Sequence, residues 1–158
     1  MITYNGKALL TRFNGSNGSI KCKNTEGTIS IIAIESYASK IIGNTDTKII
    51  LGSGTTAPTK SDYVIETEIN TLDSLNRVNN QINHPDEEYG DYDTIFSMTE
   101  TFKNNTNSNI TVNEIAVYTY WSSSNWGDNK YYMIYREVLD NPVTIEPDKT
   151  YAFSVTID

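Results

Sequence analysis

The last 65 residues alternate polar and apolar side chains over several short runs, and this alternation limits the fold more than any other feature. Within residues 94–103, Met98 and Phe102 share one face of an extended chain, while Ser97 and Thr99 share the opposite face. Further runs of this kind lie at residues 110–120, 130–139 and 150–157. A period of two residues is typical of a half-buried strand, so we predict one strand from each run.

The composition favours the same fold class over the whole chain. Ile, Val, Thr, Tyr, Phe and Trp fill 63 of the 158 positions, and these residue types fit a pleated, half-buried surface. The helix formers Leu and Ala contribute only six residues each, whereas 18 Asn and 14 Ser supply turns. We predict further strands at residues 28–36, 48–52 and 63–69. The expected fold is all-β, an antiparallel β-sandwich of the Greek-key, jelly-roll or immunoglobulin-like type.

Two local irregularities are predicted in the C-terminal part. The inward positions of the 110–120 run change parity between Val112 and Ile115, which indicates a β-bulge near Asn113-Glu114. After the strand at 130–139, a short extended piece is expected from Asn141-Pro142 to Pro147.

The N-terminal and middle segments carry weaker patterns. Residues 1–25 are predicted to be a weakly patterned arm, with an edge strand at residues 2–4 and a short strand or arm at residues 7–13. Apolar residues recur at three- to four-residue spacing within 71–82, which favours a short amphipathic helix, although an extended loop competes evenly. The length of 158 residues suits a single β-rich domain spanning 1–158.

Charge and residue counts exclude several classes of function. A net charge of −8 argues against a nucleic-acid binder, because phosphate contacts need concentrated Lys and Arg. One Cys and one His exclude a disulfide framework, a cysteine-rich zinc site and a histidine-rich metal centre. No apolar run is long enough to span a membrane, and residues 1–12 lack the pattern of a secretory signal. We therefore expect a chain that is made in a cytoplasm and stays soluble.

Candidate chemical groups are present, and each has a simpler interpretation. The acidic run Asp86–Asp93 offers oxygen ligands for Ca²⁺, but it lacks the spacing of a calcium loop, so a solvated loop is expected. A carboxylate of that run could orient His84 as a catalytic imidazole, but the sequence has no Gly-x-Ser-x-Gly elbow, and Cys22 lies far away along the chain. Lys21 and Lys23 could activate the thiolate of Cys22, but a structural cysteine is expected. Gly52-Ser53-Gly54 is predicted to be a turn, because no phosphate-loop Lys follows it. We expect no enzyme activity, no catalytic residue, no cofactor and no metal.

Aromatic residues gather around a loop rich in Ser, Asn and Gly, between the strands at 110–120 and 130–139. The candidates for contact with a partner are Tyr120, Trp121, Trp126 and Tyr131. Tyr and Trp dominate the energetics of protein–protein contacts, so another protein is the first expected partner. Two alternatives stay open, since the rings could cover the sheet or stack on sugar rings as in a carbohydrate-binding module.

Three blocks of sequence resemble small bacteriophage virion proteins. The first is Gly-Ser-Gly-Thr-Thr-Ala-Pro-Thr-Lys-Ser-Asp-Tyr within residues 50–66, and the second is Ile-Thr-Val-Asn-Glu-Ile-Ala-Val-Tyr at residues 110–118. The third joins Arg-Glu-Val-Leu at residues 136–139 to Pro-Val-Thr-Ile at residues 142–145, Pro147 and the final Tyr-x-Phe-x-Val-x-Ile. The resemblance covers residues 48–158, and it departs in the N-terminal 45 residues and in the Trp-bearing loop.

The resemblance implies a structural role in a virion. The expected protein is an auxiliary or decoration protein on a capsid, or a protein of the tail or fibre attachment. Its partners would be other virion proteins, such as the major capsid protein, tail proteins or further copies of itself in a lattice, with no nucleic acid and no membrane. Such a protein is made in the cytoplasm of the bacterial host and is located in the virion.

Overall fold

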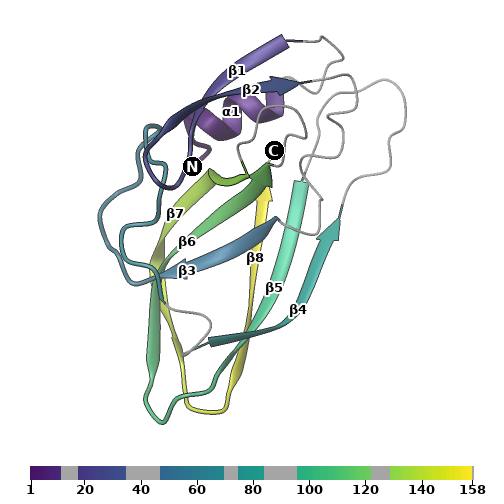
Figure 1. Ribbon diagram of the computed structural model, residues 1–158. Helices are drawn as coiled ribbons and strands as arrows, with labels where there is room; N and C mark the ends of the chain where they lie inside the picture. The colour runs from purple at the N-terminus through teal and green to yellow at the C-terminus, as the bar shows by residue number, and fades with distance from the viewer. Residues whose placement is uncertain (12–17, 35–46, 70–74, 84–95, 122–128, 158) are drawn as a thin grey trace.

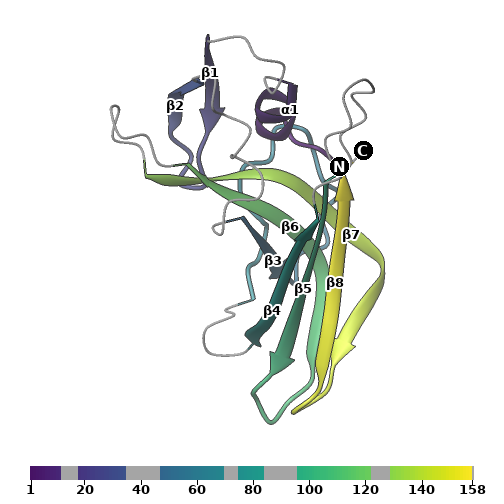
Figure 2. The same cartoon turned by 90° about the vertical axis from the view of Figure 1, so that its right-hand side faces the viewer.

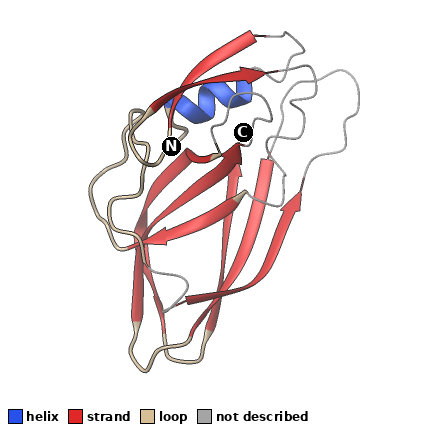
Figure 3. Cartoon of the chain, viewed as in Figure 1, coloured by secondary structure: helices blue, strands red, loops and turns tan. Residues whose placement is uncertain are grey.

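The computed structural model describes residues 1–11, 18–34, 47–69, 75–83, 96–121 and 129–157 (Figure 1). The helix is α1 (Tyr4–Thr11), and the strands are β1 (Gly18–Lys23), β2 (Ile29–Ile34), β3 (Lys48–Gly52), β4 (Leu75–Asn83), β5 (Phe96–Asn104), β6 (Ile110–Trp121), β7 (Lys130–Ile145) and β8 (Thr150–Ile157). Strands dominate the described part of the chain, as Figure 3 shows by colour. All named strand pairs are antiparallel, so the predicted all-β class is confirmed.

The strands form three sheets. One sheet has the order β3-β6-β7, a second has the order β4-β5-β8, and β1 pairs only with β2. The two three-stranded sheets lie beside one another below the β1–β2 hairpin and α1, which sit at the upper end (Figures 1 and 2). We call α1, β1 and β2 the N-terminal cap.

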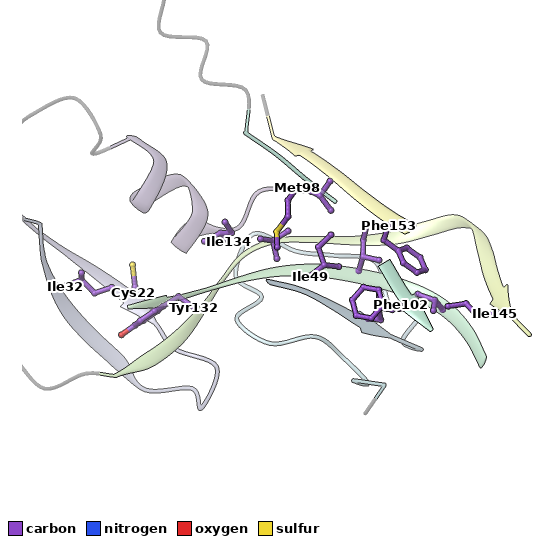
Figure 4. Close-up of a cluster of buried hydrophobic side chains, with 14 of the residues drawn as sticks. Cys22, Ile32, Ile49, Met98, Phe102, Tyr132, Ile134, Ile145 and Phe153 are labelled. Atoms are coloured by element: carbon purple, nitrogen blue, oxygen red, sulfur yellow. The ribbon is translucent and has the colours of Figure 1, made fainter. Parts of the chain in front are cut away.

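One hydrophobic core runs from the cap to the lower end of the molecule. Its side chains come from the cap and from both three-stranded sheets, and Figure 4 shows them as one continuous row. The fully buried members include Ile32, Ile49, Met98, Phe102, Tyr132 and Ile145. Burial of a large apolar side chain stabilises a fold by roughly 1.5–3 kcal/mol, so this row is the main stabilising feature.

The long pair β6–β7 connects the cap to the lower end. Its register shifts between Val112 and Glu114, where a bulge was predicted, although the extra residues, 139–142, lie on β7. A second shift, between Val117 and Tyr118, places Ile134 as an extra residue on β7. Bulges increase the local twist of a strand and change which of its residues share a face. The two ends of β7 can therefore pack against different parts of the molecule.

Asn104 stabilises the lower end of the molecule, and its side chain is fully buried. Its amide Nδ2 donates to the carbonyls of Ser108 and Ile145, both at 2.8 Å, and its Oδ1 accepts from the backbone N–H of Thr106 at 2.9 Å. Its backbone also pairs with Asp148 and Lys149 in the turn before β8. One side chain therefore ties together the two connections that cross between the sheets.

The predicted strands at 28–36, 48–52, 94–103, 110–120, 130–139 and 150–157 are confirmed as β2, β3, β5, β6, β7 and β8, except that residues 35–36 and 94–95 lie outside the described residues. Met98 and Phe102 are buried while Ser97 and Thr99 are half-exposed, as the alternation of β5 predicts. The extended piece expected from Asn141 to Pro147 is instead the second half of β7, which runs to Ile145. Pro142 is tolerated there because it lies at the irregular part of the β6–β7 ladder.

The helix predicted within 71–82 is wrong, because residues 75–83 form strand β4. Pairing with β5 gives this segment backbone partners along its length, and its many Asn residues favour a helix poorly. The register shifts between Arg77 and Asn79, and such an irregularity breaks the simple period of two on which strand recognition depends. Residues 70–74 lie outside the described residues.

The strand or arm expected at residues 7–13 is also corrected, since residues 4–11 form α1. Thr3 begins the helix, because its Oγ1 accepts the backbone N–H of Gly6 at 3.1 Å and its carbonyl accepts that of Lys7 at 2.9 Å. Gly6 lets the helix approach β7, since an added Cβ would lie 2.1 Å from the carbonyl oxygen of Ile134. The edge strand expected at residues 2–4 is reduced to a bridge between Ile2 and Tyr135.

Candidate functional site

The structure brings two of the predicted contact residues together on β6 and β7. Tyr120 and Tyr131 are direct cross-strand partners, with ring centroids 5.0 Å apart and ring planes at 57°. The Nζ of Lys48 lies 3.9 Å from the centre of the Tyr131 ring, within the range of a cation–π interaction. Trp121 ends β6, but its side chain lies outside the described residues, as does all of Trp126.

The faces of this aromatic pair are partly covered. Both tyrosines are half-buried, and their rings are tilted against each other rather than coplanar. Lys48 also covers one face of Tyr131, whereas stacking on a sugar requires an open, flat face.

Arg136 on β7, which sequence reasoning did not select, has several polar partners. Its side chain is 5% exposed. Its Nε donates to Glu114 Oε2 at 2.8 Å, and Nη1 donates to Asp62 Oδ2 at 2.6 Å. Nη2 reaches the carbonyl of Thr56 at 3.2 Å and lies 2.7 Å from Glu114 Oε2. Arg136 therefore joins β6 to the segment 53–68, which follows β3.

Glu114 is the second centre of this network and is fully buried. Its Oε1 accepts the backbone N–H groups of Gly54 and Thr67, both at 3.0 Å. Its Oε2 also accepts the N–H of Glu66 at 3.4 Å. One carboxylate thus replaces a neighbouring strand as the hydrogen-bond acceptor for this segment. We call Glu114, Arg136, Asp62 and Glu66 the Arg136 network.

The network explains why the strand predicted at residues 63–69 is wrong. Only Glu68 forms a bridge, to Gly52, and the rest of the segment has no strand pairing. The N–H of Ile65 donates to the hydroxyl of Tyr118 at 2.8 Å, and neighbouring N–H groups donate to Glu114. Side chains of β6 therefore take the backbone hydrogen bonds that a ladder would otherwise provide.

Glycine is required where this segment approaches Glu114. An added Cβ at Gly54 would lie 2.4 Å from Glu114 Oε1, and one at Gly52 would lie 2.6 Å from the same atom. The Gly52-Ser53-Gly54 sequence, predicted to be a turn, therefore serves a close approach to a buried carboxylate.

The carboxyl groups at the edge of the network are held ionised. Partial burial acts to raise the pKa of Asp62, but hydrogen bonds from Thr59 and the charge of Arg136 outweigh it and hold the pKa below its ordinary value. The pKa of Glu66 is lowered chiefly by the backbone N–H and hydroxyl of Thr56. Burial acts to lower the pKa of Arg136, whereas its bonds to Asp62 and Glu114 raise it.

An open groove of about 550 Å³ adjoins the network. Its lining includes Lys23, Thr56, Ser61, Asp62, Tyr63 and Glu66. The polar atoms of the network already bind one another, since Arg136 donates to Asp62 and Glu66 accepts from Thr56. The Arg136 network is therefore a structural contact that holds a loop against a sheet.

The remaining candidates divide into one that the structure places and two that it does not. Cys22 is buried in the core, and burial raises the pKa of its thiol to about 12, so the reactive thiolate is disfavoured. His84 and the acidic run Asp86–Asp93 lie outside the described residues. Among the residues that the structure does describe, no His, Cys, Asp or Glu cluster has the arrangement of a metal site. No helix in this part of the chain is long and apolar enough to cross a membrane.

Within the described residues, the protein is antiparallel all-β, with an aromatic pair on β6 and β7 and a buried charged network that joins these strands to the segment 53–68. Comparisons with protein-family models, curated proteins and solved structures find no match. Function is therefore inferred from the residues of this chain.

Proposed function

We propose that this protein is a structural component of a bacteriophage virion. The favoured role is an auxiliary or decoration protein bound to the capsid, and the neighbouring possibility is a protein of the tail or fibre attachment. In either role the protein binds other virion proteins and needs neither a cofactor nor a catalytic residue.

One observation carries this proposal. Asp62, Glu114 and Arg136 belong to the three separate sequence blocks that resemble phage virion proteins, and all three residues meet in the Arg136 network. The network joins positions 74 and 22 residues apart along the chain. Sequence blocks that resemble one family and also contact one another in the folded protein support a shared fold more strongly than sequence similarity alone.

The finer description of the fold is part of the same proposal. We assign the pair of three-stranded sheets to a β-sandwich of the Greek-key, jelly-roll or immunoglobulin-like type. The shared hydrophobic core supports this assignment, because Leu51 and Val117 come from one sheet, while Phe102 and Val155 come from the other.

The contact surface is assigned to Tyr120 and Tyr131, together with the Trp-bearing segment between their strands. The aromatic pair lies at the end of β6 and β7, where it is half-buried and next to Lys48. The carbohydrate-binding module remains the competing function, with the same residues as its platform.

Mass spectrometry of purified phage particles tests the proposal directly. The chain should be present in a fixed ratio to the major capsid or tail proteins, and its absence from particles would overturn the assignment. Tyr131→Ala should reduce incorporation while leaving the isolated protein folded, since the ring is only half-buried. Tyr151→Ala is the matched control, because Tyr151 is 44% exposed on a different sheet.

A glycan array separates the two functions. If Tyr131→Ala is incorporated normally but loses binding to a glycan that the unmodified protein binds, the carbohydrate-binding module is correct and the virion-contact role of this surface is wrong. If both tyrosine variants are incorporated normally and no glycan binds, the contact surface lies elsewhere.

A further inference from the structure

The β1–β2 hairpin of the N-terminal cap has two edges, and the edge on β1 is covered by α1. The Oδ1 of Asn5 accepts the backbone N–H of Lys23 at 2.9 Å, and the Nδ2 of Asn5 donates to the carbonyl of Lys23 at 2.7 Å. Both backbone groups of Lys23 therefore point away from β2. Figure 2 shows the same order of elements, with β1 between α1 and β2.

This contact determines which residues of β2 form the opposite edge. In an antiparallel pair, opposite residues alternately bond to each other and point their N–H and C=O groups outward. Lys23 is paired with Ile29 and points its groups outward, so Ile29 does the same on its own side of the hairpin. The alternation continues at Ile31 and Ala33. Within the part of the chain that the structure describes, no strand pairs with this outer edge of β2.

The side chains along this edge are apolar and exposed. Ile29 and Ile31 are 66% and 64% exposed. Lys23 lies on the same face and packs 3.7 Å from the centre of the Tyr63 ring, and the two isoleucines stay exposed beside this contact. The whole strand reads Ile-Ser-Ile-Ile-Ala-Ile, without charge, Pro or Gly. An apolar edge strand of this composition is a template for a strand of another chain.

We propose that β2 of a second copy of this protein adds to the outer edge of β2, so that the two hairpins form one antiparallel sheet. A twofold axis at Ile31 sets this residue opposite its counterpart in the second copy and sets Ile29 opposite Ala33. In that register the outward N–H and C=O groups of both copies bond to one another. The inference goes beyond the proposed function, since purified protein can associate in this way without any virion.

The symmetry and charge of the strand favour a second copy as the occupant. Opposite residues of an antiparallel pair share a face, so Ile29 and Ile31 of both copies lie side by side and leave water. The strand is uncharged, so no like charges oppose each other across the contact. Lys21 is the β1 partner of Ile31, and its two copies are three strand spacings apart, about 14 Å. This separation exceeds the screening length of ~8 Å at physiological salt.

The same geometry predicts that association stops at a dimer. In the joined sheet both β2 strands lie inside, and each outer strand is a β1 whose edge at Lys23 already bonds to Asn5 of its own copy. A third hairpin therefore finds this edge occupied. The contact joins identical surfaces and closes on itself.

Amide hydrogen exchange and sedimentation velocity over a range of concentrations test the contact. The amides of Ile29 and Ile31 should exchange rapidly in dilute protein and become protected as a dimer forms. The amides of Ser30 and Ile32 are the internal control, because they bond to β1 in both states. A monomer at every concentration overturns the inference, and so does association that continues beyond a dimer.

The pattern of protection separates the other occupants of this edge. If Ile29 and Ile31 are protected in the monomer, the edge is covered within its own chain, and the contact between copies is wrong. If a dimer forms while these amides still exchange rapidly, the contact lies elsewhere on the molecule. If they are protected only in phage particles, a strand of another virion protein occupies the edge, which also overturns the inference.

Two substitutions at one position test the backbone and the side chain. Ile31→Pro removes an N–H that the hairpin itself does not use, and an edge strand tolerates Pro at such a position. Ile31→Lys places a charge on the apolar edge. Each should weaken dimerisation by about tenfold or more, since burial of one isoleucine is worth at least that factor.

Tyr151→Lys is the matched control, because Tyr151 is 44% exposed on β8, and this variant should dimerise normally. Equal weakening by Ile31→Lys and Tyr151→Lys would mean that added charge alone controls association, and normal dimerisation of both Ile31 variants would place the contact elsewhere; either result overturns the inference. Circular dichroism checks that all variants are folded. Presence or absence of the chain in phage particles bears only on the proposed function.

Discussion

The two faces of the β3–β6–β7 sheet are covered in different ways. On one face, Ile49, Leu51 and Val117 pack against the β4–β5–β8 sheet as part of the large core. On the other face, Ile50, Tyr118 and Met133 form a small apolar cluster with Ile65. The segment that covers this second face is held by the Arg136 network rather than by a further sheet.

The two faces of this sheet are covered in two physically different ways. A sheet covers its neighbour through apolar area, which needs no exact partner for each atom. A segment without strand pairing must still satisfy its backbone N–H groups, because each buried N–H without a partner costs about 1–3 kcal/mol. Glu114 and Tyr118 supply those acceptors, and Arg136 balances the buried carboxylate.

The largest effect is expected from Arg136→Met. Removal of the cation leaves the fully buried Glu114 without its charge partner, and loss of one member of a buried ion pair costs about 3–5 kcal/mol. Urea denaturation should show this loss. Lys130→Met is the control, since its ion pair with Glu26 is exposed and should be worth less than about 1 kcal/mol. Similar losses for both variants would contradict the central role of the network.

Met98→Ala tests the apolar face with a cost of about 3 kcal/mol, because Met98 is fully buried between the sheets. Urea denaturation should show this loss, and a cost below about 1 kcal/mol would contradict the role of Met98 in the core.

Tyr118→Phe should cost about 1–2 kcal/mol. The change removes the hydroxyl that accepts the N–H of Ile65 at 2.8 Å while keeping the ring in the small cluster. Amide hydrogen exchange should show faster exchange at Ile65 with little change at residues of β5. Unchanged protection of Ile65 would mean that the hydroxyl is not its partner in solution.

Acid should weaken the charged face in a smaller and graded way. The pKa values of Asp62 and Glu66 are lowered from their ordinary values of 3.8 and 4.5 by bonds from Thr59, Thr56 and Arg136. Their stabilisation is present above those ordinary values and is lost as the pH falls through the lowered ones. The melting temperature should therefore drop below about pH 4, and Asp62→Asn should make that drop shallower. An unchanged drop would place the acid-sensitive group elsewhere.

The sequence predicted the apolar face well because periodicity reports burial directly. Alternation over residues 94–103 identified the buried side of β5, and the parity change after Val112 identified the place where the register of the β6–β7 ladder shifts. The same rule failed at β4, where the pairing with β5 is irregular. It also failed at α1, which begins at the hydroxyl of Thr3 and packs against β7 through Gly6.

The charged face was harder to predict because its key residues break the rule that charges lie outside. Glu114 stands in phase with Ala116 and Tyr118, which are both buried, so a charged residue in phase with apolar ones was the available signal. Its partner Arg136 lies across the hairpin, and Asp62 lies in a segment without regular structure, so no local pattern connects them. Of the aromatic candidates, alternation alone placed Tyr120 on β6 and Tyr131 on β7, but only the register showed that they meet.

Residues 1–3 pair with the edge of β7, so this pairing can form only after β7 has been synthesised. Met1 accepts the N–H of Arg136 through its carbonyl, and Thr3 donates its N–H to Ile134. The two partners of the first contact lie 135 positions apart in the chain. At a synthesis rate of about 5–20 residues per second, residues 1–3 wait on the order of ten seconds for their partner strand. The edge of β7 is therefore covered by residues that are made long before β7 itself.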